Sequence, residues 1–177
     1  MTGARHDDAV IRPYAAADWA NVWAILQPVF RAGETYAFAR DISAEQARDA
    51  WTGGGKQVFV AEDEASGGLL GTYYLKTNFD GAASHICNCG YVVSEQARGR
   101  GIAARMCEHS QREAIARGYR AMQYNLVVSS NDSAVHLWTK MGFAIVGTIP
   151  EAFLHPRLGF VNAYVMYKRL VAAEPTA

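Results

Sequence analysis

A segment rich in glycine and arginine follows an apolar run in the middle of the chain. The apolar run covers residues 86–93, and the segment consists of Arg98, Gly99, Arg100, Gly101, Ile102 and Ala103. Glycines let a ligand approach the backbone closely, and the first turn of a helix carries unpaired N–H groups and partial positive charge. The two arginines add full charges. These residues predict a cradle for a pyrophosphate where a strand passes into a helix.

Two widespread phosphate-binding motifs do not fit this segment. A P-loop needs Gly-x-x-x-x-Gly-Lys followed by Ser or Thr, and the chain lacks it. A dinucleotide fingerprint needs Gly-x-Gly-x-x-Gly, but Ala104 stands at the third glycine, and no fitting acidic residue follows downstream. The plain alternative is an ordinary glycine turn with surface arginines.

The segment resembles the Arg/Gln-x-x-Gly-x-Gly/Ala signature of the GNAT superfamily of acyl-CoA N-acyltransferases. The register that begins at Arg98 is preferred to the one that begins at Gln96, which lies too close to the end of the strand. Residues 131–143 resemble the superfamily's Asn-x-x-Ala-x-x-Leu-Tyr-x-x-x-Gly-Phe segment, at the usual distance downstream. The resemblance implies the GNAT fold of the α/β (α+β) class. That fold has a mixed, mostly antiparallel sheet, flanked by helices, with two central strands that splay apart.

A narrower resemblance links the chain to the GNAT branch that contains the fungal azetidine-2-carboxylate acetyltransferases. It rests on residues 88–91, 124–127, 137–138 and 150–167. It implies an enzyme that transfers the acetyl group of acetyl-CoA to a primary or secondary amine. The acceptor would be a small molecule or an amino acid, which attacks directly in a ternary complex. A protein or peptide N-acetyltransferase, or a non-catalytic acyl-CoA-binding module, are the alternatives.

The resemblance also assigns the cofactor residues. Acetyl-CoA would be bound by the backbone of Val92 and Val93 and by residues 98–103. Asn131 would reach the pantetheine arm, or it would simply cap the helix that follows.

The usual catalytic groups of the superfamily are missing. Trp138 stands where many members have a tyrosine acid, and indole cannot give up its proton at working pH. Either thiolate release needs no side-chain acid, or Tyr91 or Tyr124 takes that role, and Trp138 is expected to pack beside the pantetheine. Neither residues 86–93 nor residues 119–128 include a carboxylate, but each run contains one asparagine, Asn88 or Asn125. An amide inside an apolar strand needs hydrogen bonds. We expect both to orient the acceptor amine, or else to satisfy the backbone of the splayed sheet.

A loop between the first two expected helices contains Glu34 and Tyr36. In the superfamily this region shapes the acceptor pocket, so Glu34 is expected to bind a substrate ammonium and Tyr36 to wall the pocket. A solvated loop is the alternative.

The elements that must position these residues can be read from periodicity and turn residues. Strands are expected at residues 11–14, 58–61, 69–77, 86–93, 119–128, 143–149 and 163–170. Helices are expected after Asp18, after Ser43, over residues 101–117, and from Asn131 or Asp132 to Met141. Pro28 and Gly33 should end or bend the first helix. Hairpins dominate early and helices alternate with strands later, which predicts one domain over residues 1–177, ordered over about 10–171.

Composition limits the partners. Seventeen basic residues balance seventeen acidic ones, so no net field attracts nucleic acid or an anionic membrane. Three cysteines and a short polar N-terminus favour a cytoplasmic protein. His85, Cys87 and Cys89 alternate along a strand but lack zinc spacing, so no metal is expected. The apolar C-terminal strand would suit a homodimer.

Overall fold

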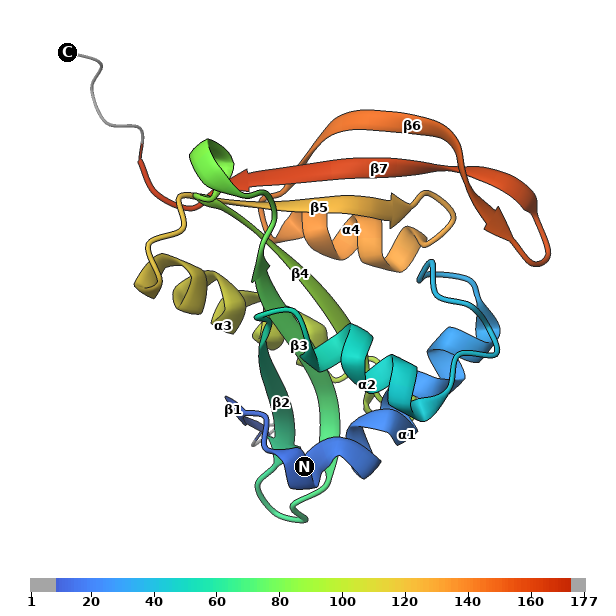
Figure 1. Cartoon of the computed structure of the whole chain (residues 1–177), viewed down its shortest axis with the longest axis vertical. Helices are drawn as coiled ribbons and strands as arrows, with labels where there is room; N and C mark the ends of the chain where they lie inside the picture. The colour runs from blue at the N-terminus through green and yellow to red at the C-terminus, as the bar shows by residue number, and fades with distance from the viewer. Residues whose placement is uncertain (1–8, 173–177) are drawn as a thin grey trace, which may run out of the picture.

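The structure, a computed structural model, describes residues 9–172 (Figure 1). One seven-stranded sheet runs in the order β1-β2-β3-β4-β5-β7-β6. The strands are β1 (Ala9–Pro13), β2 (Gln57–Asp63), β3 (Leu69–Thr77), β4 (Ile86–Val93), β5 (Ala121–Val128), β6 (Ala144–His155) and β7 (Gly159–Arg169). The helices are α1 (Trp19–Ala32), α2 (Ala44–Thr52), α3 (Ile102–Ala116) and α4 (Asp132–Lys140). Among the described strands, only β4 and β5 pair in parallel, so the mixed, mostly antiparallel sheet is confirmed.

The helices cover the two faces of the sheet in pairs (Figure 1). Leu26 of α1 and Trp51 of α2 share a buried cluster with Val60 of β2 and Val92 of β4. Side chains of α3 and α4 share a second cluster that includes Cys89 of β4. Because successive strand residues face opposite sides of a sheet, β4 contributes even-numbered side chains to the α1–α2 face and odd-numbered ones to the α3–α4 face.

The two central strands separate soon after they start. β4 and β5 pair at Ile86 with Ala121 and at Cys87 with Met122, and no further registered pair follows. Beyond that point β5 follows β7, with an irregularity between Tyr124 and Val127. Figure 1 shows the two strands diverging toward their carboxyl ends. The splayed strands that the resemblance implies are therefore present.

Local signals set the ends of the first two helices. Ser43 Oγ accepts the Gln46 N–H at 3.1 Å, and Gln46 Oε1 accepts the Ser43 N–H at 3.0 Å, which confirms the predicted capping box. Gly33 ends α1 in the left-handed region, with φ 66°. Pro28 does not end α1 but lies inside it. A proline removes one helical hydrogen bond, and here the buried apolar face of α1 outweighs that loss.

The expected cap at Asp18 is wrong. Its side chain makes no capping hydrogen bond to α1. Instead it accepts two hydrogen bonds from Arg12, at 2.8 and 2.9 Å, and one from the Ala15 N–H at 2.7 Å. Charge-assisted bonds to a guanidinium are stronger than a neutral cap, so Asp18 ties β1 to the turn before α1.

The two C-terminal strands are longer than expected. Predicted to end at residue 149, β6 runs to His155 and pairs with β7 from Gly159 onward. Pro150 is tolerated because β6 is an edge strand and Pro150 falls in the irregular stretch between Ile149 and Phe153, where β6 has no registered partner on β7. The hairpin exposes apolar side chains: Ile145, Val146, Ile149, Leu154, Leu158 and Phe160.

Candidate active site

The glycine-rich segment forms an open backbone turn between β4 and α3. Gly99 has φ 75° and Gly101 has φ 76°, a region in which residues with a Cβ are strained. A Cβ built on either glycine would meet nothing within 4 Å. The backbone N–H groups of Gly99, Gly101, Ile102 and Ala103 donate no hydrogen bond within residues 9–172. Open space above unpaired N–H groups at a helix start suits a diphosphate.

The two arginines of this turn differ in their surroundings. Arg100 lies 3.3 Å from Asp63 of β2, which neutralises part of its charge. Arg98 is exposed and forms no ion pair with any described residue. The positive side-chain charge available to an anion at this turn is therefore mainly that of Arg98.

The backbone of β4 offers alternate residues to the gap between β4 and β5. Asn78 N–H bonds to Ile86 O, and Ser94 N–H bonds to Leu70 O. With the unbroken register between β3 and β4, these bonds direct the even-numbered backbone groups of β4 to β3. Cys89, Tyr91 and Val93 consequently direct theirs into the gap. Of the two valines predicted to bind acetyl-CoA, Val93 directs its backbone groups into the gap, whereas the Val92 backbone is engaged with β3.

The two predicted asparagines meet through a third one. Asn78, just after β3, exchanges hydrogen bonds with Asn125 of β5, and Asn88 of β4 donates to Asn78 Oδ1 at 3.3 Å. Gln123 donates to Asn125 Oδ1 at 3.0 Å. The sequence argument missed Asn78 and Gln123. The signal for Gln123 was its alternation with Asn125, which places both on one face of β5.

Asn88 keeps one acceptor unused. Its side chain is 9% exposed, and its Oδ1 accepts no hydrogen bond from any described residue. No buried side-chain oxygen or nitrogen in the described chain lacks a partner, so this oxygen is reachable from solvent. It lies on the α1–α2 face, beside the start of the gap, and can accept an N–H of a small ligand.

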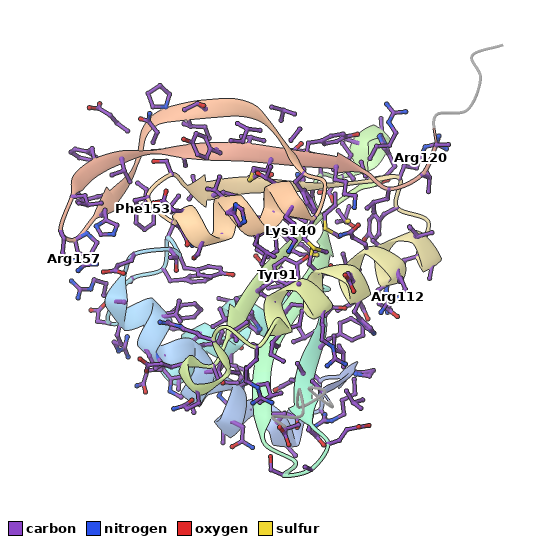
Figure 2. The ribbon with its side chains drawn as sticks, turned by 180° about the vertical axis from the view of Figure 1, so that it is seen from behind. Tyr91, Arg112, Arg120, Lys140, Phe153 and Arg157 are labelled. Atoms are coloured by element: carbon purple, nitrogen blue, oxygen red, sulfur yellow. The ribbon has the colours of Figure 1, made fainter. Side chains whose placement is uncertain are left out.

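On the opposite face, the rings of Tyr91 and Tyr124 pack beside the indole of Trp138. Tyr91 O–H lies 2.7 Å from Ser110 Oγ and 3.1 Å from Tyr124 O–H. The Trp138 ring centroid lies 5.0 Å from that of Tyr91 and 5.1 Å from that of Tyr124. Figure 2 shows Tyr91 between α3 and α4. Burial raises the pKa of Tyr91 and of Tyr124 well above 10, so both stay protonated near neutral pH.

A cavity of about 500 Å³ lies where the α1–α2 loop, the start of α4 and the β6–β7 hairpin meet. It is lined by Glu34, Thr35, Ser130, Asn131, His155, Arg157 and Leu158. Glu34 forms an ion pair with Arg157 at 2.7 Å, and Figure 2 shows Arg157 at the hairpin tip. Asn131 Oδ1 accepts the Ala134 N–H at 3.3 Å, so it caps α4 while it lines the cavity.

Tyr36 lies deeper than the loop expectation suggested. Its hydroxyl donates to the carbonyl of Tyr91 at 3.0 Å, and its ring contacts Phe30, Phe38 and Trp51. Burial raises its pKa well above 10. Tyr36 therefore closes the side of the gap formed by β4, whereas Glu34 lies at the outer cavity.

Other kinds of site are not assembled in residues 9–172. No group of three or more His, Cys, Asp or Glu side chains there could hold a metal ion. The cysteines Cys87, Cys89 and Cys107 are free and buried. No helix in the same range is long and apolar enough to cross a membrane.

Known proteins are similar to this chain in both sequence and fold. Residues 19–143 match the family described as the acetyltransferase (GNAT) family. The chain is 36% identical over 98 residues to N-acetyltransferase aca1 of Schizosaccharomyces pombe, covering 55% of this chain and 47% of that protein. It thus spans about half the length of this curated relative, whose similarity agrees with the predicted resemblance to fungal acetyltransferases.

Solved structures extend the similarity over nearly the whole chain. A GCN5-related N-acetyltransferase from Kribbella flavida is 36% identical, with a TM-score of 0.85, covering 91% of this chain and 97% of that one. A phosphinothricin acetyltransferase from Sinorhizobium meliloti, solved in complex with AcCoA, has the same fold at 23% identity and a TM-score of 0.81, covering 95% and 93%. By the family match over residues 19–143 and by its similarity to the Kribbella flavida structure, the chain belongs to the acetyltransferase (GNAT) family.

Proposed function

We propose that this protein transfers the acetyl group of acetyl-CoA to a primary or secondary amine of a small molecule or amino acid. The observation that carries the proposal is the row of unpaired N–H groups at Gly99, Gly101, Ile102 and Ala103, beside two splayed strands. Acetyl-CoA, when bound, supplies the thioester. Membership of the family supports the same activity. We further propose that one domain, residues 1–177, carries it out.

Binding of the donor follows from the backbone. The N–H groups of residues 99–103 and the charges of Arg98 and Arg100 would hold the diphosphate. The N–H of Tyr91, whose carbonyl already accepts from Tyr36, and the backbone groups of Val93 would bind the amides of the pantetheine arm. In this proposal Tyr91 takes the place predicted for Val92. Asn131, at the start of α4, would contact the arm from the other side of the gap.

The acceptor amine would lie against the asparagine cluster. Asn88 Oδ1 is accessible and can accept an amine N–H, while Asn125, held by Asn78 and Gln123, fixes the orientation. Neither asparagine can take a proton, so both are positioning residues. The amine lone pair forms the new C–N bond, the C–S bond breaks with its electron pair on sulfur, and the amine proton goes to water.

No side-chain acid is required in this scheme. Tyr91 and Tyr124 keep their protons too firmly, because burial raises the pKa of each well above 10. Their hydroxyls also lie on the α3–α4 face, bonded to each other and to Ser110. The thiol of CoA is itself acidic enough to leave as a thiolate, so the position of Trp138 does not need a proton donor. We propose that Trp138 serves only to pack Tyr91 and Tyr124 beside the pantetheine arm.

The loop residues take separate roles in this proposal. Tyr36 forms the wall of the gap beside Tyr91. Glu34 would bind a substrate ammonium at the outer cavity only by sharing its carboxylate with Arg157. This ion pair joins the α1–α2 loop to the β6–β7 hairpin beside the cavity. Because these two segments narrow the path into the cavity, the site favours small acceptors over a long peptide.

Release of free CoA, followed with a thiol reagent, tests the function directly. Acetyl-CoA is offered with amino acids, polyamines and short peptides. Release that depends on an amino acid or small amine is expected. Release only with peptides would support a peptide N-acetyltransferase. Tight acetyl-CoA binding without release with any acceptor would favour an acyl-CoA-binding module, for which the missing carboxylate is the supporting observation.

Two further properties belong to the proposal. The exposed apolar side chains of the β6–β7 hairpin, such as Val146 and Phe160, support a homodimer, which the mass in solution tests. The three free cysteines support a reducing, cytoplasmic setting.

A further inference from the structure

Two lysines lie on the α1–α2 face of the sheet, and one of them lies beside the ring of Tyr74. Lys56, just before β2, places its Nζ 5.6 Å from the ring centroid of Tyr74 and donates to the carbonyl of Gly53 at 3.1 Å. Lys76 follows Tyr74 by two positions on β3, so both side chains share one face. Both lysines are half-buried.

Neither lysine has a counter-ion among the residues that the structure describes. Within residues 9–172, Lys56 and Lys76 form no ion pair with a carboxylate. Burial, and after it the charge of Lys76, lower the pKa of Lys56. Two neighbouring ammonium groups, one of them partly desolvated, repel each other unless an anion lies between them. Such an arrangement is typical of a site that binds a negatively charged group.

This lysine pair adjoins the asparagine cluster. In the register between β3 and β4, Lys76 stands opposite Asn88, and Tyr74 stands opposite Gly90. A Cβ on Gly90 would lie 2.6 to 2.9 Å from Tyr74 ring and hydroxyl atoms, so the Tyr74 ring occupies the place of a β4 side chain. The Tyr74 hydroxyl makes no hydrogen bond with any described residue and is reachable from solvent.

We propose that Lys56, Lys76 and the Tyr74 hydroxyl form an anion subsite that binds a carboxylate of the acceptor while its amine lies at Asn88. The inference rests on the proposed function and narrows its acceptors to amino acids and related anionic amines.

Matched acceptors and matched variants test the subsite. Each amino acid of the panel is compared with its carboxamide, for wild type, Lys56→Met and Lys76→Met. The exposed Lys140→Met on α4, on the opposite face of the sheet, is the control (Figure 2). We expect kcat/KM for the amino acid to fall about tenfold to a hundredfold in the two subsite variants, as loss of a charge-assisted hydrogen bond predicts. The carboxamide and the control variant should be unaffected.

Equal turnover of acid and carboxamide by the wild type would overturn the subsite while leaving the acetyltransferase intact. A parallel fall with both acceptors in a subsite variant would also overturn it. If none of the acceptors in the panel causes release of CoA, the proposed function is contradicted instead. The subsite is then judged by binding: amino acids, but not carboxamides, should raise the melting temperature of the wild type and not of Lys76→Met. No such shift in the wild type overturns the inference.

Discussion

Asn78 and Asn125 bind each other through both ends of their amides. Asn78 Nδ2 donates to Asn125 Oδ1 at 3.1 Å, and Asn125 Nδ2 donates to Asn78 Oδ1 at 2.7 Å. Because β4 lies between β3 and β5 in the sheet, this pair reaches across β4 at the point where β4 and β5 separate. It ties the narrow end of the gap and presents Asn88, bonded to the same Asn78, to a ligand.

We expect Asn125→Ala to lower kcat about tenfold while the Kd for acetyl-CoA stays unchanged, since a neutral hydrogen bond is worth about 1 kcal/mol. Because Asn125 is held by Asn78, Asn78→Ala should have a similar effect, and the double variant should be little worse than either single one. Steady-state kinetics and calorimetry measure both quantities. Asn162→Ala, which removes a hydrogen bond to Glu151 on the distant hairpin, is the control. If the losses of kcat in the two single variants add up in the double variant, the two asparagines act independently and the prediction is wrong.

Gly101→Glu should raise the Kd for acetyl-CoA by about a hundredfold, because a carboxylate would then stand above the unpaired N–H groups. Gly101→Ala separates charge from backbone strain, which costs about 1–2 kcal/mol of stability at a positive φ. Gly118→Ala is a matched control at φ 85°, at the far end of α3, again with nothing within 4 Å of a Cβ. Calorimetric titration of each folded variant decides. Unchanged affinity in Gly101→Glu would remove the cradle from the site.

Alkaline pH should destabilise the protein through its buried tyrosines. Burial holds the pKa of Tyr91 and Tyr124 well above 10, whereas an unfolded tyrosine ionises near 10. Above pH 10 the unfolded state therefore binds fewer protons, and the free energy of unfolding falls by about 1.4 kcal/mol per pH unit for each such residue. Urea denaturation between pH 9 and 11 measures the slope. Tyr124→Phe should reduce it, and an identical slope in this variant would contradict the assignment.

Gly90→Ala should destabilise the protein by about 1–3 kcal/mol, since its Cβ would meet the Tyr74 ring at 2.6 to 2.9 Å. Displacing that ring would also disturb the lysine pair, so the KM for an anionic acceptor should rise more than that for acetyl-CoA. Gly147→Ala, on β6, has only one atom near its Cβ, at 4.0 Å, and serves as the control. Thermal melting and paired KM values test this. Equal stability of the two variants would mean that the Tyr74 ring moves aside at little cost in free energy, which would contradict the prediction.

The sequence by itself determined the features that depend on neighbouring residues. The glycine-rich turn was readable because Gly99 and Gly101 adopt a positive φ that other residues avoid. Ser43 and Gln46 are three residues apart, the spacing of a capping box. β3 and β4 have the predicted bounds, because apolar runs between turn residues are local signals. The family signature consists of such local patterns, and the resemblance to it predicted the fold.

The tertiary structure alone decided which distant residues meet. Asn78 lies 47 residues from Asn125, and Lys56 lies 20 residues from Lys76, yet sheet order and register bring each pair onto one face. Periodicity gives the face of a strand but not its neighbour, because pairing is a long-range choice of register. The structure also decided the partner of Asp18. Its position before α1 suits a helix cap, but Arg12 on β1 competes more strongly for its carboxylate.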